Sequence, residues 1–444
     1  MAGGRLARAV WSRLKEHKKK TAFFAVASIA FVNIGRSRVE ERRIFLDYCL
    51  KARSYGREPI APLENPRKVT VLVGDELQNQ KTWRSFEKYA LPLLHLAGVK
   101  VDIAQLSSLY DNSADREWKT SDALYVVGRD SEISQIINLL MGAGDMDVRE
   151  LRRAAKQVPA LAFFPAECHE HVAEQLLPRS YPLVRWYCES AMAVIAGVHR
   201  SGAVVKYKID DKPAVLTIGC VHIGDIGETS DLRFAVFRKM RERWLYLRKA
   251  LMRRSSESIH LSVEYAEPCY GCKRCSYADP KSSTRGSWLS WLFNWRNNDI
   301  GSGKLESSVV NDRCGERTKL TLSTCEVSAF NNLRSDVPKL SVAFGPEYMN
   351  KWEYLVETWR RVRSERPYIT SESTSVQKAL EASECVMELH PKNSHGENQQ
   401  CTVVVDGEQV EASTITLQTV PNIFRLLAPC PKVDNELGIE DVKL

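Results

Sequence analysis

The chain has 444 residues, of which 44% are hydrophobic and 27% charged, and its formal net charge is +8. This is a normal globular composition, and the length exceeds one ordinary domain, so we expect two domains with insertions. The twelve cysteines are too scattered for a disulfide scaffold. The basic residues lie beside apolar segments and form no groove-reading motif, which excludes nucleic acid as the expected partner.

Residues 1–60 are expected to form a basic leader, a short membrane anchor and a linker. The residues ahead of the apolar run 21–35 include seven lysines and arginines but only one acidic residue, Glu16, and more arginines follow the run. A helix over this run covers roughly 22 Å of a ~30 Å hydrocarbon core, so it is a marginal span. A secretory signal, a mitochondrial targeting and anchoring segment, and a buried helix are the three interpretations. The arginine-rich, almost acid-free leader favours the mitochondrial one.

Residues 61–180 are expected to form an α/β domain of the nucleotide-binding kind. Apolar runs at 68–73, 99–103, 123–127 and 158–165 predict strands. Apolar residues at helical spacing predict helices within 83–96, 133–140 and 167–177. This alternation of strands and helices predicts a parallel sheet with helices on its faces.

Residues 181–444 are expected to form a β-rich sandwich domain. Extended runs replace the strand–helix alternation, at 203–209, 215–218, 318–327, 340–344, 402–405 and 414–417. Two polar insertions are expected to interrupt this domain, at about 253–317 and about 364–400, the first as an excursion and the second as a loop. The sequence therefore predicts a two-domain protein.

Two segments have the composition of membrane-surface elements. Tryptophans, leucines and a phenylalanine crowd into 288–295 between Arg285 and Arg296. The stretch 237–251 is a cationic amphipathic helix by its spacing. Each has an alternative interpretation, because an aromatic run also buries against its own protein and one apolar stripe is enough to pack two domains.

Three cysteines, Cys269, Cys272 and Cys275, have the spacing of metal ligands. A closed zinc site needs four ligands, and Cys314 is the candidate for the fourth sulfur. The alternative is a cysteine-rich surface loop without metal.

The most informative stretch is 123–132, a buried strand that runs into a turn containing Gly128 and Asp130. Glycines at such a turn let the backbone approach a phosphate, which the start of the next helix attracts. Arg129 and Ser131 place Cβ atoms in this turn. A guanidinium can bind phosphate, but it cannot reproduce a tight glycine turn, so we expect a nucleotide site that is weak or absent.

The chain resembles the diacylglycerol and sphingosine kinase family, in particular its mitochondrial acylglycerol kinases, as a divergent member with degenerate nucleotide-binding loops. The resemblance covers most of the length apart from the two insertions, and it is strongest over 86–98 (FEKYALPLLHLAG). The basic N-terminus and the order of the two domains fit as well. In the family, the turn after 123–127 reads Gly-Gly-Asp-Gly-Thr, of which Gly128 and Asp130 remain.

The resemblance implies two further nucleotide loops. The first falls on 74–78, where the expected asparagine is absent and two acids occupy the turn. The third falls on 164–168, where Glu167 remains while Ala166 replaces a glycine. Carboxylates beside a triphosphate repel it unless a metal ion intervenes, so these changes weaken the expected binding of ATP.

Two more sets of acids follow from the resemblance. Asp406 and Glu408 match the family's acidic motif near the nucleotide and magnesium, although Asp-Gly also suits a β-hairpin turn. Asp225 and Glu228 lie in 219–228, which looks like the domain junction that carries the general base for the lipid hydroxyl. Their alternative role is to cap a following helix.

The resemblance implies phosphorylation of monoacylglycerol or diacylglycerol to lysophosphatidic or phosphatidic acid with magnesium and ATP. It also implies a place at the mitochondrial inner membrane, on the intermembrane-space side. The altered loops favour a second interpretation, a pseudokinase scaffold that helps the inner-membrane translocase to insert carrier proteins. A sensor that binds the lipid without turnover is the third.

Overall fold

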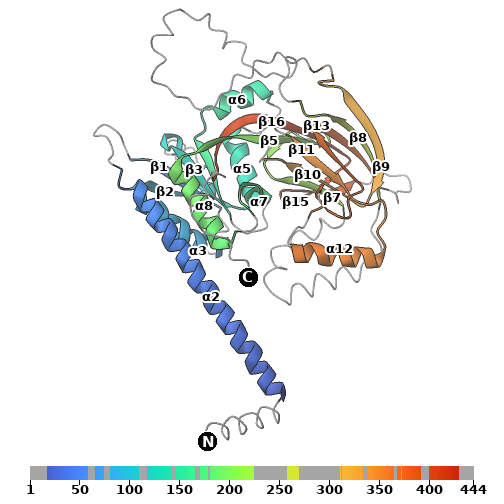
Figure 1. Ribbon diagram of the computed structural model, residues 1–444. Coiled ribbons are helices and arrows are strands. Elements are labelled where there is room, and N and C mark those ends of the chain that lie inside the picture. Colours follow the sequence, from blue (N-terminus) through green and yellow to red (C-terminus); the bar gives the residue numbers. More distant parts are fainter. Residues whose placement is uncertain are drawn as a thin grey trace, which may run out of the picture.

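The computed structural model describes residues 18–58, 66–74, 81–109, 118–142, 146–165, 171–178, 181–224, 258–269, 311, 313–333, 339–364, 368–371, 373–391 and 400–429. Within these residues, a sheet of ten strands and a separate sheet of six carry the fold (Figure 1). The expected architecture, an α/β region with a parallel sheet followed by a β-rich sandwich, is confirmed.

The α/β region is built on four neighbouring parallel strands. In spatial order they are β2 (Lys100–Gln105), β1 (Lys68–Val73), β3 (Ala123–Gly128) and β4 (Ala160–Pro165). Strands β3 and β4 are buried along their whole length. Their near-continuous apolar sequence reflects this position, because helices cover both faces of the sheet.

One face of these strands is covered by α8 (Leu183–Ala196) and by a helical stretch made of α3 (Lys81–Ser85), η1 (Phe86–Ala90) and α4 (Leu91–Leu96). The sequence predicts one helix over 83–96, but η1 is a π-helical turn. Pro92 explains the difference, because it has no N–H for the regular ladder and its ring widens the preceding turn. The N–H of Leu91 accordingly reaches back five residues to the carbonyl of Phe86.

The other face is covered by α5 (Asp130–Met141) and α6 (Val148–Ala155). Short helical turns, η2 (Leu106–Leu109) and η3 (Trp118–Thr120), lie between β2 and β3, and α7 (His171–Leu176) follows β4. The two apolar clusters on either side of the strands thus hold the parallel sheet between two helical layers.

The large sheet continues beyond β4 into the second half of the chain. Strand β16 (Thr414–Leu427) pairs parallel with β4 and antiparallel with β13 (Glu384–Pro391) and β5 (His199–Ile209). The remaining strands are β8 (Ile259–Ala266), β9 (Arg317–Thr324) and β6 (Val215–Thr217). The C-terminal strand β16 therefore joins both halves of the protein.

The six-stranded sheet is antiparallel and packs on this extension. Its spatial order is β12 (Lys378–Ala382), β11 (Leu340–Phe344), β10 (Glu326–Asn331), β7 (Cys220–Gly224), β14 (Cys401–Val405) and β15 (Glu408–Ala412). One apolar cluster takes buried side chains from both sheets. This shared core makes the second half a β-sandwich. Helix α12 (Lys351–Ser364) packs at its outer side (Figure 1).

Strands occupy parts of the chain that were expected to be polar insertions. Strand β8 lies within 253–317, and β12 and β13 lie within 364–400. In β13, Cys385, Met387 and Leu389 are buried in the core, while Val386, Glu388 and His390 between and after them are more exposed. Such alternation supports a half-buried strand despite a polar average composition. The aromatic run 288–295 and the cationic stretch 237–251 lie outside the described residues.

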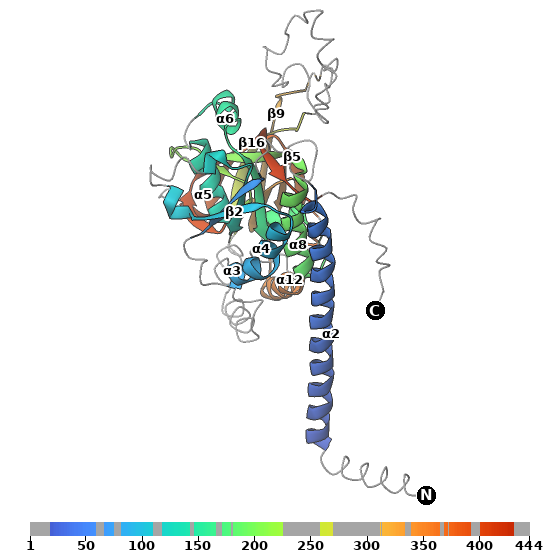
Figure 2. The same ribbon diagram turned by 90° about the vertical axis from the view of Figure 1, so that its left-hand side faces the viewer.

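Helix α2 (Lys18–Tyr55) contains the apolar run 21–35 and continues well beyond it. Its C-terminal part packs on the α/β region, where Ala52 is fully buried and the Tyr48 hydroxyl donates a hydrogen bond to Glu189 of α8. The rest of α2 projects away from the body (Figure 2). Among the described residues, no helix combines the length and the hydropathy that a membrane crossing requires.

The docking of α2 is tested by enlarging Ala52. Because Ala52 has no exposed surface, Ala52→Leu is expected to overpack the contact and lower the free energy of unfolding by about 1–3 kcal/mol. Leu50 on the same helix is 67% exposed, so Leu50→Ala is expected to change that free energy by less than about 0.5 kcal/mol. Chemical denaturation of the full chain measures both. Equal effects of the two substitutions would contradict the described packing of α2.

Candidate functional site

The three predicted nucleotide loops start side by side at one edge of the parallel sheet. The N–H of Gly74, just after β1, donates to the carbonyl of Val127 at 3.4 Å, and Gly128 of β3 pairs with Pro165 of β4. These positions are the carboxyl ends of the strands, where α/β sheets commonly bind ligands. Residues 75–78 of the first loop and 166–168 of the third, with Glu167, lie outside the described residues.

The carboxylate of Glu132 fills the space between the first two loops. It turns back from the first turn of α5, and its Oε2 accepts a hydrogen bond from the N–H of Arg129 at 2.7 Å. A Cβ atom built on Gly74 would overlap with this carboxylate, and one built on Gly128 would lie 2.9 Å from its Oε2. The two glycines thus form a cradle, which we call the glycine cradle, and Glu132 occupies it.

A tight hairpin brings Asp406 to the same part of the molecule. Asp406 and Gly407 form the two-residue connection between β14 and β15, with φ of +49° and +95°. Positive φ at both positions is typical of a type I′ turn, which favours Asp-Gly. The Asp-Gly sequence therefore serves a hairpin turn, and this turn also places an acidic side chain against α5.

The carboxylate of Asp406 accepts hydrogen bonds from three separate elements. Its Oδ2 accepts from the hydroxyl of Ser134 on α5 at 2.5 Å and from the hydroxyl of Thr217 at the end of β6. Its Oδ1 accepts from the N–H of Cys220 on β7 at 2.9 Å. Burial raises the pKa of Asp406 to about 6, although these hydrogen bonds oppose the shift, and the negative charge of Glu408 raises it further.

Two of the other predicted acids surround this point. A Cβ atom on Gly219 would overlap with Oδ1 of Asp406 and would lie 3.5 Å from Oδ2 of Asp130, so both side chains border Gly219. Glu408 accepts a hydrogen bond from the side chain of Gln135 on α5 at 3.2 Å. The structure therefore brings together four of the predicted residues, namely Gly128, Asp130, Asp406 and Glu408.

Among the described residues, the glycine cradle leaves no room for a phosphate of ATP while Glu132 occupies it. The glycine cradle holds the side chain of Glu132, and Asp130 lies in the same first turn of α5. Carboxylates repel a polyphosphate by several kcal/mol at contact distance near a protein surface, about 4 kcal/mol for each pair of unit charges. Within the part of the chain that the structure describes, no group of three or more His, Cys, Asp or Glu residues could hold a metal ion.

The predicted general base is not among the described residues. Asp225 and Glu228 lie outside the described residues, but the preceding strand β7 is described up to Gly224. At ~3.3 Å per residue, β7 separates Gly224 from Cys220, the partner of Asp406, by about 13 Å. Among the described residues, Gly224 and Cys220 thus lie at opposite ends of β7.

A row of buried polar side chains on β7 and β10 was not predicted from the sequence. Nδ1 of His222 lies 2.7 Å from the hydroxyl of Ser328, and its ring lies 5.3 Å from that of Tyr368. Glu326 is fully buried beside Gly224, its partner across the strands. These side chains come together only through pairing of strands that are distant in the sequence, so no local motif predicts them.

The cysteine cluster is only partly described. Cys269 and Cys314 are half-buried, and the side-chain amide of Asn311 donates to Sγ of Cys269 at 3.4 Å. Cys272 and Cys275 lie outside the described residues. Zinc at Cys269, Cys272 and Cys275 remains a prediction.

Comparison with known proteins gives distant relatives, and no family model matches the chain. An uncharacterized protein of Caenorhabditis elegans is 28% identical over 367 residues, which cover 78% of this chain and 79% of that protein. The mitochondrial acylglycerol kinase of Homo sapiens is 22% identical and that of Mus musculus 19%, each over about 85% of both chains. A diacylglycerol kinase structure from Bacillus anthracis superposes with a TM-score of 0.45 at 13% identity, covering 82% of this chain and 98% of that one.

The buried carboxylate of Asp406 predicts a pH-dependent stability. Its pKa rises from 3.8 to about 6 on folding, so the unfolded chain loses this proton first and stability falls as pH rises from about 4 to 6. Compared with Asp406→Asn, the wild type is expected to lose on the order of 2–3 kcal/mol over this range. Denaturation at pH 4, 5, 6 and 7 measures the two profiles.

Glu411, an exposed acid of the same hairpin, supplies the control substitution Glu411→Gln. The comparison uses the slope of the free energy of unfolding against pH. The absolute values are not compared, because Asp406→Asn also changes the hydrogen bonds of this side chain at every pH. Parallel profiles of the wild type and Asp406→Asn would show that the carboxyl group does not titrate in the folded protein at the expected pH.

Proposed function

Because the chain is a divergent relative of the mitochondrial acylglycerol kinases, we propose that it is a mitochondrial lipid-kinase-like protein that no longer binds ATP tightly and acts without phosphoryl transfer. The observation that carries this proposal is the carboxylate of Glu132 in the glycine cradle. Glycines at this edge leave room for a phosphate in a nucleotide-binding protein. Here an anionic side chain of the protein takes that room.

Several acids strengthen the proposal. Asp130, Asp406 and Glu408 lie near the first turn of α5, so their charges add to that of Glu132. The start of a helix stabilises negative charge, but Asp130 and Glu132 already supply it in the first turn of α5. A triphosphate would have to displace one carboxylate and approach the others.

The role that remains for such a protein is a scaffold at the inner mitochondrial membrane. Its proposed partners are subunits of the translocase that inserts carrier proteins, and an acylglycerol lipid is its proposed small ligand. The arginine-rich leader and the mitochondrial relatives support the location. Co-purification from mitochondria in mild detergent tests the partnership. Recovery of the folded chain without any translocase subunit would contradict it.

The proposed block of the nucleotide site is tested with Glu132→Ala. Removing the carboxylate opens the glycine cradle, so a fluorescent ATP analogue with Mg²⁺ is expected to bind at least about tenfold more tightly than to the wild type. Binding is measured by fluorescence anisotropy on the full chain.

Glu150→Ala is a matched control, because Glu150 occupies the corresponding position of α6 and caps the N–H of Asp147 at 3.3 Å. Both variants lose a similar helix cap, whereas only Glu132→Ala opens the cradle. Tight binding to the wild type, or the same affinity in the wild type and Glu132→Ala, would contradict the proposal.

A second candidate is an active kinase that phosphorylates monoacylglycerol or diacylglycerol with magnesium and ATP. The observation that favours it is the convergence of Asp130 and Asp406 on Gly219, since carboxylate oxygens are the ligands that Mg²⁺ prefers. Its predicted residues are Asp225 or Glu228 as the base and Gly128, Asp130, Glu167, Asp406 and Glu408 at the nucleotide. Tight binding of the analogue to the wild type would favour this candidate.

A further inference from the structure

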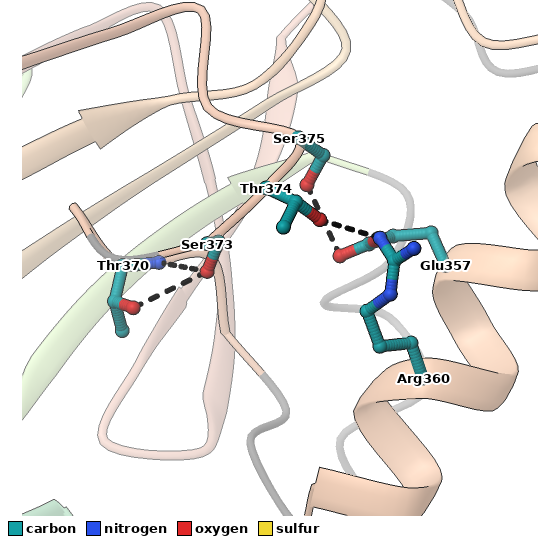
Figure 3. Close-up of polar contacts among 6 residues, drawn as sticks. All are labelled: Glu357, Arg360, Thr370, Ser373, Thr374 and Ser375. Carbon is teal, nitrogen blue, oxygen red and sulfur yellow. Dashed lines mark hydrogen bonds and ion pairs between the residues drawn. The ribbon is translucent and has the colours of Figure 1, made fainter.

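A polar clamp joins helix α12 to the turn that follows it and precedes β12 (Figure 3). Oε1 of the buried Glu357 accepts a hydrogen bond from the hydroxyl of Ser375 at 3.0 Å, and Oε2 pairs with the guanidinium of Arg360 at 3.0 Å. The same guanidinium donates to the hydroxyl of Thr374 at 2.5 Å. Within the adjoining turn, the N–H of Thr370 donates to Ser373 at 2.9 Å. The clamp fixes which side of α12 faces the protein.

The start of α12 is fixed as well. Oδ1 of Asn350 accepts hydrogen bonds from the N–H groups of Trp352 and Glu353 at 3.0 and 2.9 Å. The carboxylate of Glu353 reaches back to the N–H of Asn350 at 3.0 Å. This reciprocal cap, together with the buried Tyr354, leaves the helix little freedom to rotate about its axis.

The opposite side of α12 carries an unusual apolar stripe. Tyr348 is 64% exposed, Trp352 77%, Val356 55% and Trp359 50%. Trp352, Val356 and Trp359 follow one another at intervals of four and three residues, so they line one side of α12, and Tyr348 lies three residues ahead of the helix. Two exposed tryptophans on one line of a helix are more than scattered surface residues, because such side chains gain most when they bury their rings.

The position of this stripe indicates what covers it. Helix α12 lies at the end of the body beyond which the N-terminal part of α2 continues (Figures 1 and 2). That part of α2 exposes Phe31 and Ile34, which are 79% and 54% accessible. Both apolar surfaces therefore lie toward the same end of the molecule, where one extended apolar surface is able to meet both.

We propose that the stripe formed by Trp352, Val356 and Trp359 of α12, with Tyr348 just ahead of the helix, docks in the interface of an anionic lipid bilayer. Tryptophan and tyrosine rings favour this interface because they combine an apolar body with a polar group. Exposed Lys351 lies beside Trp352 at the start of the helix and is able to pair with a lipid phosphate. With 14 residues, α12 spans about 21 Å, so it lies on the bilayer and does not cross it.

This inference is independent of the proposed loss of ATP binding, since α12 and the glycine cradle are separate parts of the molecule. The test uses the full chain with vesicles of phosphatidylcholine and cardiolipin, with the same vesicles containing brominated lipid, and with pure phosphatidylcholine. Flotation measures binding, and bromine quenching measures tryptophan insertion. Trp352→Ser with Trp359→Ser removes the stripe. Ile103→Ser with Val198→Ser removes two exposed apolar residues elsewhere, which are 50% and 39% accessible.

The wild type and the control pair are expected to bind the cardiolipin vesicles, with bromine quenching. The stripe variant is expected to bind at least about tenfold more weakly and to lose the share of the quenching that Trp352 and Trp359 contribute, while the other eight tryptophans of the chain remain. Helix α2 is able to hold the chain on the vesicle even without the stripe. A stripe variant that still binds but has lost this quenching therefore also supports the proposal. Quenching unchanged in the stripe variant, or absent in the wild type, would overturn it. Wild-type dimers that the stripe variant abolishes in sedimentation without lipid would also overturn it, because a second copy would then cover the stripe.

Discussion

The carboxylate of Asp406 is the contact on which the arrangement of the site depends. It joins a hairpin turn late in the chain to Ser134 of α5 and to the connection between β6 and β7. Side-chain bonds from Asn138 of α5 to the backbone of Leu216 hold the same elements together at 2.7 and 2.8 Å. Helix α5 is thus fixed between the parallel sheet and the β-sandwich. A buried carboxylate with an elevated pKa costs stability near neutral pH, and this cost is offset by three hydrogen bonds.

The orientation of α5 decides what its first turn does. With Ser134 held by Asp406, the start of the helix points at the carboxyl ends of β1 and β3, where a phosphate would otherwise meet backbone N–H groups. Glu132 takes that place with a hydrogen bond to the N–H of Arg129. In the function that we propose, the fold of a lipid-kinase relative is retained while Glu132 takes the place of a phosphate. The stripe on α12 belongs to another surface, so the proposed membrane contact does not depend on the nucleotide site.

Sequence reasoning succeeds here where a pattern is local. The strands β1 and β3, the helix α5 and the Asp406 turn follow from apolar periodicity and from Asp-Gly chemistry. The sequence does not predict the π-helical turn before Pro92, because the apolar spacing there fits a regular helix. It also does not predict the strands β8, β12 and β13, because their segments have a polar average composition. Ser134 and Thr217 carry no motif at all, since they meet Asp406 across 272 and 189 residues. Glu132 lies in the predicted loop, but the residue three positions before it is Arg129 and not the Ser, Thr, Asp or Asn of a capping signature, so the local sequence does not point to its contact with the N–H of Arg129.

We propose that this chain retains the lipid-kinase fold without its chemistry. The most direct measurement is transfer of labelled γ-phosphate from ATP to monoacylglycerol and diacylglycerol in mixed micelles, with the purified full chain and Mg²⁺. Circular dichroism before and after the assay verifies that the protein stays folded. The account predicts no labelled lysophosphatidic or phosphatidic acid above the protein-free background. Steady formation of either product by the wild type, with loss of that activity in Asp130→Asn, would contradict it.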